Sequence, residues 1–124
     1  MSKRTLAVYA ALIFAAGIST GLALAKSAGQ QKEPGAKLLL DNQRVTVTEV
    51  TMAPAARRAA YTRPSDQIIV FLDAADYEAT DAAGQKQIKH RNSGEIVWHQ
   101  KGEAAPLLVN QGAQPYRNLV IALK

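Results

Sequence analysis

Short apolar segments that alternate with a period of two dominate the chain after residue 36, and they predict β-strands. Val45 and Val47 share one face of such a strand, whereas Val50 and Met52 join that face only if one residue is inserted between the two pairs. This change of phase predicts a β-bulge near residues 48–49. No window in this part of the chain shows the apolar repeat of a helix, so we expect an all-β fold.

The remaining strands are separated by turn-forming residues. Residues 67–72 read Gln-Ile-Ile-Val-Phe-Leu, a nearly continuous apolar run that is typical of a strand covered on both faces. The turn at residues 110–112 separates the apolar segments 107–109 and 118–123, which predict two more strands. Short strands that each end at Gly, Pro, Asn or Asp predict an antiparallel sandwich or a small barrel.

A turn at residues 92–94 (Asn-Ser-Gly) predicts that the segments on either side of it form a hairpin. Ile96 and Trp98 share one face of the second segment, so we expect Trp98 in the core and His99 on the opposite face. The hairpin would also bring His99 near His90, the other histidine of the chain. Two imidazoles make only a weak candidate metal pair, because zinc and copper sites use three or four ligands. We expect both histidines to be partly exposed strand residues.

The first residues have the pattern of an export signal. Lys3 and Arg4 precede an apolar stretch, and small residues then provide a signal-peptidase site after Ala25. We therefore expect residues 1–25 to be a signal peptide that is cleaved. Residues 5–25 are uncharged and just long enough to cross a bilayer, so an uncleaved membrane anchor is the alternative. Both alternatives place the folded part outside the cytoplasmic membrane, either in the periplasm or secreted.

The rest of the chain is predicted to be one domain. Residues 26–36 are polar and predict a linker, and residues 37–124 hold the predicted strands. A length of 124 residues allows one compact domain and little more. The formal net charge of +5 becomes +3 without residues 1–25, which contain two basic residues and no acidic one. This mild charge fits a solvated surface, and we expect Arg57 and Arg58 to protect an exposed loop or sheet edge.

The composition excludes several classes of function. The chain has no cysteine, which excludes disulfides, thiolate metal sites and cysteine nucleophiles. Only 6% of the residues are aromatic and no basic run is interleaved with them, which argues against a nucleic-acid partner. No Ser-His-Asp order, Gly-rich phosphate loop or His-Glu-x-x-His motif is present. The acidic residues at positions 73, 76, 78 and 81 lack the register of a calcium loop, so we expect them in solvated turns.

The order of these segments resembles that of a small single-domain cupin, an RmlC-like jelly-roll β-barrel. Residues 54–56, followed by the strand at 67–74, look like the first motif of the family. Residues 94–98 (Gly-Glu-Ile-Val-Trp), followed by the Gly, Asn and Pro residues of 102–115, look like its second motif. Residues 117–124 resemble its closing strand. The resemblance implies an antiparallel cupin-like barrel, and also a homodimer, because such proteins often pair through sheet packing.

The family resemblance implies a metal site as well, and here the chain departs from the pattern. Two histidines and a glutamate of the first motif would stand at Tyr61, Arg63 and Gln67. A third histidine would stand at Ala105 or Pro106. None of these residues is the expected ligand, and Arg63 carries a fixed positive charge that repels a divalent ion. We therefore expect neither a metal ion nor another cofactor.

Tyr61, Arg63 and Gln67 form a candidate ligand site instead, because by resemblance they would line the mouth of the barrel. A guanidinium suits a carboxylate or phosphate, and a phenol and an amide can orient it. Alternatively, Arg63 pairs with Asp66 or another carboxylate and only fills the interior. Our leading hypothesis is an exported, metal-free and non-enzymatic domain that binds a small, anionic ligand or a protein partner. The alternatives are a metal-independent enzyme that uses Tyr61 and Arg63 or a histidine, and a structural module of the cell envelope.

Overall fold

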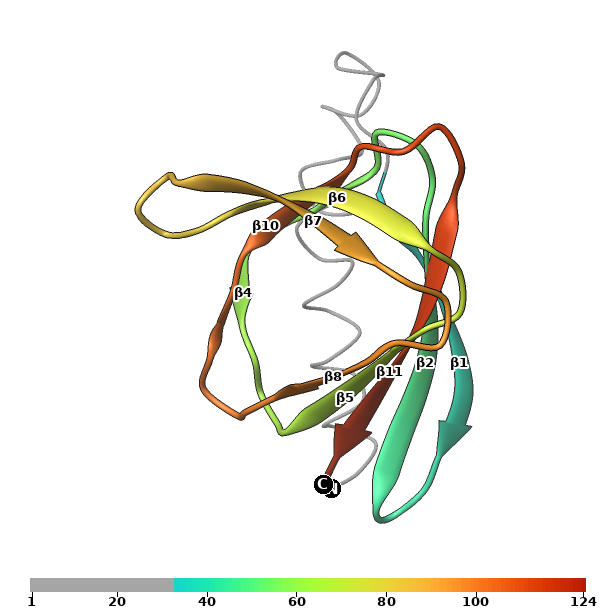
Figure 1. Ribbon diagram of the computed structural model, residues 1–124. Coiled ribbons are helices and arrows are strands. Elements are labelled where there is room, and N and C mark those ends of the chain that lie inside the picture. The colour runs from blue at the N-terminus through green and yellow to red at the C-terminus, as the bar shows by residue number, and fades with distance from the viewer. Residues whose placement is uncertain (1–32) are drawn as a thin grey trace, which may run out of the picture.

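The computed structural model describes residues 33–124, which form an all-β, antiparallel fold (Figure 1). The predicted signal peptide or anchor (residues 1–25) and most of the predicted linker lie outside the described residues. The first strand begins at Gly35, slightly before the predicted start of the domain. Within the described part of the chain, no helix has the length and hydropathy of a membrane span.

A five-stranded antiparallel sheet forms one wall of the domain. In spatial order its strands are β1 (Gly35–Asp41), β2 (Val45–Met52), β11 (Tyr116–Leu123), β5 (Gln67–Phe71) and β8 (Ile96–His99). Along β2 and β5, buried residues alternate strictly with partly exposed ones. Each of these strands therefore turns one face to the interior and the other outward.

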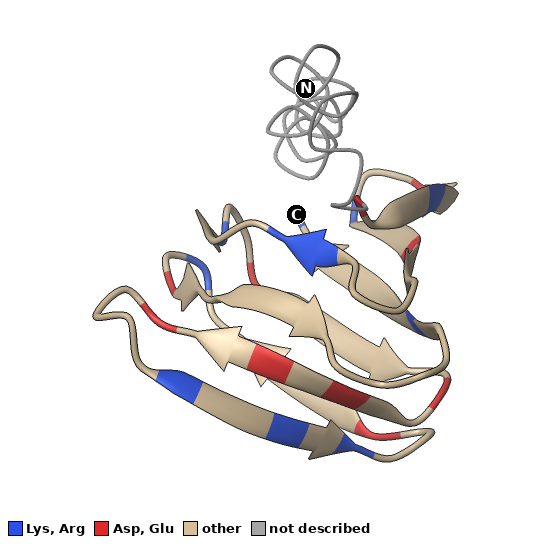
Figure 2. Cartoon of the chain, turned by 90° about the horizontal axis from the view of Figure 1, so that it is seen from above, with Lys and Arg blue, Asp and Glu red and all other residues tan. Residues whose placement is uncertain are grey.

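A four-stranded antiparallel sheet faces the first one (Figure 1). Its strands, in spatial order, are β3 (Arg57–Arg58), β10 (Leu107–Asn110), β6 (Ala75–Thr80) and β7 (Lys86–Arg91). Figure 2 shows that basic positions along β7 lie beside acidic positions on the neighbouring β6. A short ladder of β4 (Tyr61–Thr62) and β9 (Ala104–Ala105) connects the two walls at one side.

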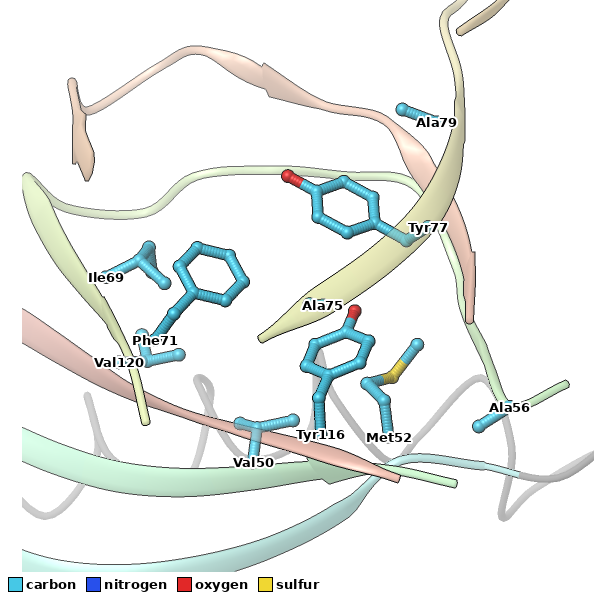
Figure 3. Packing of buried hydrophobic residues seen from close by; sticks show 10 residues of the cluster. All are labelled: Val50, Met52, Ala56, Ile69, Phe71, Ala75, Tyr77, Ala79, Tyr116 and Val120. Carbon is cyan, nitrogen blue, oxygen red and sulfur yellow. The ribbon is translucent and has the colours of Figure 1, made fainter. Parts of the chain in front are cut away.

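The core lies between the two walls and is built around three aromatic rings. Phe71 of β5, Tyr77 of β6 and Tyr116 of β11 have ring centroids separated by 6.3, 6.2 and 6.1 Å. Figure 3 shows the rings approaching one another from the two sheets, with Met52 and Ile69 nearby. Aromatic pairs at such distances stabilise a core beyond their buried area, so these rings hold the two sheets together.

β2 contains no bulge, so the prediction of a bulge near residues 48–49 is wrong. The strand alternates regularly over its whole length, with Thr46 and Thr48 buried and Val45 and Val47 on the outer face. The register shift lies in the neighbouring β1 instead. The pattern misled because buried threonines occupy the inner positions at the start of β2, where apolar residues were assumed.

Trp98 lies on the outer face of β8, so its predicted position in the core is wrong. Trp98 is 53% exposed and Ile96 is 67% exposed. Trp98 pairs with Ile68 of β5, whose outer face also carries apolar residues. His99 points to the opposite face, as predicted, and contacts the interior. Both faces of β8 are apolar, so hydrophobicity alone did not show which of them is inside.

The jelly-roll sheets are not closed into a barrel. β1 and β8 are the edges of the larger sheet, β3 and β7 those of the smaller one, and no ladder joins these edges within residues 33–124. β7 and β8 follow each other through the turn at residues 92–94, but they pair with β6 and β5. The predicted hairpin is therefore wrong, and His90 and His99 belong to different sheets. The domain is an open sandwich of two antiparallel sheets.

Candidate functional site

A cavity of about 120 Å³ lies between the two walls, near the β4–β9 ladder. Most of its wall is apolar or aromatic, including Val50, Ile69, Phe71, Tyr77, Tyr116 and Val120. The ionisable side chains beside these are Arg58, Tyr61, Arg63, Lys89, Arg91 and His99. None of the Asp and Glu residues in the described segment lines the cavity. An apolar cavity with a few convergent polar groups is the usual form of a small-molecule site.

Arg63 is the buried cation of this cavity, with only 4% of its surface exposed. Its Nη1 donates hydrogen bonds to Gln67 Oε1 at 2.9 Å and to the Tyr61 hydroxyl at 3.3 Å. Its Nε lies 4.0 Å from Glu103 Oε2 and has no hydrogen-bond partner among the described residues. Burying an N–H of a charged group without a hydrogen bond is costly, and the carboxylate of Glu103 is the nearest negative charge to it.

Gln67 supports Arg63 and does not line the cavity. Its side chain is completely buried, and it lies opposite His99 on the neighbouring strand. Its Oε1 accepts the hydrogen bond from Arg63, and its Nε2 is without a partner in the described part of the chain. The structure thus brings the predicted residues together, with Tyr61 and Arg63 in the wall and Gln67 against Arg63. Asp66, one suggested partner of Arg63, accepts a backbone hydrogen bond instead. The alternative of another carboxylate near Arg63 is met by Glu103, at 4.0 Å.

The positions at which the resemblance places metal ligands converge, but their side chains do not fit a metal. Tyr61 pairs with Ala105 across the β4–β9 ladder, and Pro106 lines the cavity with Tyr61 and Arg63. The donors in the cavity wall are three phenols, one amide and the imidazole of His99, and guanidinium groups lie beside them. No group of three or more His, Cys, Asp or Glu residues suited to a metal occurs in residues 33–124. This donor set does not fit a divalent metal ion.

The two histidines have separate surroundings. His90 is exposed on β7, where its Nδ1 lies 2.6 Å from Asp76 Oδ1, and this hydrogen bond raises the pKa of His90. His99 lines the cavity, and its Nδ1 lies 3.1 Å from Glu103 Oε2. Because the two strands do not form a hairpin, the structure does not provide the arrangement on which the candidate metal pair depended.

Burial and nearby charge set the ionisation of the His99–Glu103 pair. Burial, followed by the positive charge of Arg63, lowers the pKa of His99, and the hydrogen bond to Glu103 opposes this. The backbone N–H of Gln100, followed by the hydrogen bond with His99, lowers the pKa of Glu103. At neutral pH the carboxylate is therefore ionised and the imidazole is mainly neutral.

Four site residues were not predicted from the sequence: Arg58, Lys89, Arg91 and Glu103. Arg58 lies in the edge strand β3, as expected, but its side chain lines the cavity, with its guanidinium carbon 5.2 Å from the Tyr61 ring centroid. Its Nη2 also donates to the carbonyl oxygen of Pro106. The consecutive arginines Arg57 and Arg58 were the available signal, because neighbouring residues of a strand point to opposite faces. Glu103 follows a turn, and no pattern in the sequence marked it.

Solved structures with a similar fold are cupins and related proteins. A cupin domain from Bordetella pertussis matches with a TM-score of 0.70 and 17% identity, over 77% of this chain and 97% of that one. An RmlC-like cupin family protein with a double-stranded β-helix fold, from Methanocaldococcus jannaschii, has a TM-score of 0.59 and 13% identity, over 74% and 81%. The polyketide cyclase RemF from Streptomyces resistomycificus has a TM-score of 0.58 and 24% identity, over 73% and 68%.

These likenesses establish the fold. The chain has the cupin, or double-stranded β-helix, fold that the order of its segments implied. No protein-family model matches the sequence, and no curated protein matches it either. At 13–24% identity the likeness concerns the fold alone.

Proposed function

We propose that this domain binds a small carboxylate with an apolar body in the cavity between its sheets. The observation that carries the proposal is the charge of the cavity wall. Its cationic side chains are Arg58, Arg63, Lys89 and Arg91. No acidic side chain of residues 33–124 lines it, although Glu95 binds Arg91 from outside and Glu103 lies 4.0 Å from Arg63 Nε. These two carboxylates leave the wall with an excess of positive charge, which the carboxylate of a ligand would offset.

The size and shape of the cavity narrow the class of ligand. Its volume of about 120 Å³ is somewhat below the roughly 150 Å³ of an apolar cavity that holds benzene. The aromatic walls suit an apolar body of about that size. Arg63 lines the cavity, and a planar guanidinium matches two carboxylate oxygens better than the rounder phosphate. Short-chain carboxylates therefore serve as probes, and benzoate, which is larger than benzene, tests the upper limit of size.

We propose further that the domain is exported and works without a metal. The basic start, the apolar stretch and the cleavage motif of residues 1–25 support export. The replacement of every expected metal ligand and the cationic wall support a metal-free site. Mass spectrometry of the protein produced in a bacterial host would identify cleavage after Ala25. Elemental analysis that found stoichiometric metal would overturn the metal-free site.

The outer apolar face of the five-stranded sheet supports a homodimer, and we propose that two copies pair through it. Strand register places Leu40, Val47, Ile121, Ile68 and Trp98 in one row across all of its strands. These residues are all partly or largely exposed. The run at residues 67–72 is typical of a strand covered on both faces, and residues 33–124 cover only one face of it. A second copy would cover the other.

A binding experiment tests the proposed ligand class. Titration of isotopically labelled protein, followed by NMR, should give saturable shifts with benzoate, and weak or no shifts with inorganic phosphate or glucose. Arg63→Met should weaken benzoate binding at least about tenfold, because a charge-assisted hydrogen bond is lost. Arg57→Met is the matched control, since Arg57 is exposed on the same short strand as Arg58 and does not line the cavity. Absence of saturable binding, or equal binding by the Arg63 variant, would contradict the proposal.

A further inference from the structure

A histidine–carboxylate pair opens onto the cavity. His99 lines it, and its Nδ1 lies 3.1 Å from Glu103 Oε2. The other carboxylate oxygen of Glu103 accepts a 2.8 Å hydrogen bond from the backbone N–H of Gln100. This second contact fixes the carboxylate, so the neutral imidazole donates its Nδ1–H to Glu103. The lone pair then lies on Nε2, which is the nitrogen that can accept a proton.

We propose that His99 is a general base that removes a proton from the carbon next to the carbonyl group of a small oxo acid held in the cavity. Glu103 is its positioning residue. The inference rests on the proposed function, because Arg63 has to hold the carboxylate of the same molecule. It goes beyond binding, since it assigns the site a reaction.

The surroundings of His99 meet the requirements of such a base. A general base must be mainly unprotonated at the working pH, and burial together with Arg63 lowers the pKa of His99 below its usual 6.5. Negative charge that develops on the carbonyl oxygen needs a fixed positive group nearby, and arginines provide it. The charged and titratable groups of the cavity wall around His99 are Arg58, Tyr61, Arg63, Tyr77, Lys89, Arg91 and Tyr116.

The reaction needs no group beyond the protein and its substrate. His99 Nε2 takes the proton, the electrons of the C–H bond form a carbon–carbon double bond, and the carbonyl π electrons move to oxygen. The product of this step is an enolate beside an imidazolium. Return of a proton from the imidazolium to the carbon restores the oxo acid. In D₂O the imidazolium exchanges with solvent, so a deuteron returns and each cycle leaves a label.

The chain contains its own control, because His90 forms a second histidine–carboxylate pair. His90 Nδ1 lies 2.6 Å from Asp76 Oδ1, but this pair is exposed on β7 and does not line the cavity. Its hydrogen bond to Asp76 raises the pKa of His90, whereas the pKa of His99 is lowered. The two pairs contain the same chemical groups but differ in their surroundings. Comparing variants of His99 and His90 therefore shows whether the reaction needs the cavity or only an exposed imidazole.

The experiment follows the C3 protons of 2-oxobutanoate by ¹H NMR in D₂O with the full domain. The wild type should speed the loss of this signal, with a rate that rises with pH through a midpoint below 6.5. His99→Gln should slow the exchange at least about 100-fold. His90→Gln should leave it unchanged. Glu103→Gln should reduce the rate and also move the midpoint to lower pH, because Glu103 raises the pKa of His99.

The binding proposal and the proposed role of His99 can be refuted separately. Benzoate has no exchangeable proton, so its titration reports binding alone, and it also shows whether the His99 variant remains folded. Saturable binding of both acids without exchange would overturn the role of His99 and leave the binding proposal intact. Equal exchange by wild type and His99→Gln would overturn it as well. If neither acid binds and no exchange occurs, both proposals fail.

Discussion

Trp98 offers a sharp test of whether the outer apolar face pairs two copies of the chain. We expect Trp98→Thr to weaken the dimer strongly and to leave the fold intact. A Trp side chain has about 250 Å² to bury, so an exposed fraction of 53% leaves about 130 Å². At about 25 cal/mol per Å² this is about 3 kcal/mol for each copy. A twofold axis places the residue in the interface twice, but ordering costs and the remaining Thr methyl group offset part of the total.

A loss of about 3 kcal/mol overall would raise the dimer Kd by roughly 100-fold or more. Sedimentation velocity over a range of protein concentrations would measure it. The matched control is Ile88→Thr, because Ile88 is 64% exposed on β7 of the other sheet. Thermal unfolding should show that Trp98→Thr changes the free energy of unfolding of the single domain little, since Trp98 is not in the core. A wild-type chain that stays monomeric at all concentrations, or equal effects of both substitutions, would refute the reasoning.

Three further outcomes are expected. NMR titration of the imidazole protons should give His90 a pKa above 6.5 and His99 a pKa below 6.5. The His90–Asp76 pair then stabilises the fold below about pH 6.5, and this stabilisation is lost as pH rises through the pKa of His90 in the folded state. Protonation of His99 has the opposite effect, because it destabilises the fold as pH falls. Asn110→Ala should lower the free energy of unfolding, measured with urea, by about 2–4 kcal/mol, because the buried side chain forms hydrogen bonds with the backbone of Met52, Gly112 and Gln114. As a control, Gln111→Ala at an exposed position should leave this free energy almost unchanged. Arg63→Met should lower the free energy of unfolding by about 1–3 kcal/mol, because the buried Gln67 Oε1 loses its hydrogen-bond partner. A loss well above about 3 kcal/mol would make Arg63 a structural residue.

The fold could be predicted from the sequence because, in most strands, the alternation of residues along the chain agrees with the burial seen in the folded domain. β2 and β5 alternate as half-buried strands do, and the turns stand where Gly and Asn occur. The orientation of β8 could not be predicted. Ile96, Val97 and Trp98 make both of its faces apolar, and only pairing with β5 decides that Val97 and His99 face inward. Thr46 and Gln67 are polar yet buried, whereas polar residues of a strand are normally predicted to lie on its exposed face.

The candidate site was predictable in part. The spacing of the family motif placed Tyr61, Arg63 and Gln67 together, and they are in contact. Arg58 and Glu103 escaped because their positions depend on distant pairing. Arg58 reaches the cavity because β3 pairs with β10, which lies about fifty residues later in the chain. The pairing of strands that are far apart in the chain cannot be predicted from a short segment of sequence.

We expect a molecule to enter and leave the cavity beside the short β4–β9 ladder, since Tyr61 of this ladder lines the cavity. The ladder consists of two residue pairs, Tyr61 with Ala105 and Thr62 with Ala104, whereas the long strands β2 and β11 are joined by eight pairs. Backbone hydrogen bonds of Arg63 with Gly102 and Glu103 continue this ladder. Fewer bonds must still break here than between β2 and β11, so the ladder should open locally before those strands separate. A ligand would then exchange when the β4–β9 ladder opens reversibly, without a hinge motion of either sheet. The rings of Phe71, Tyr77 and Tyr116 would keep the rest of the sandwich in place throughout.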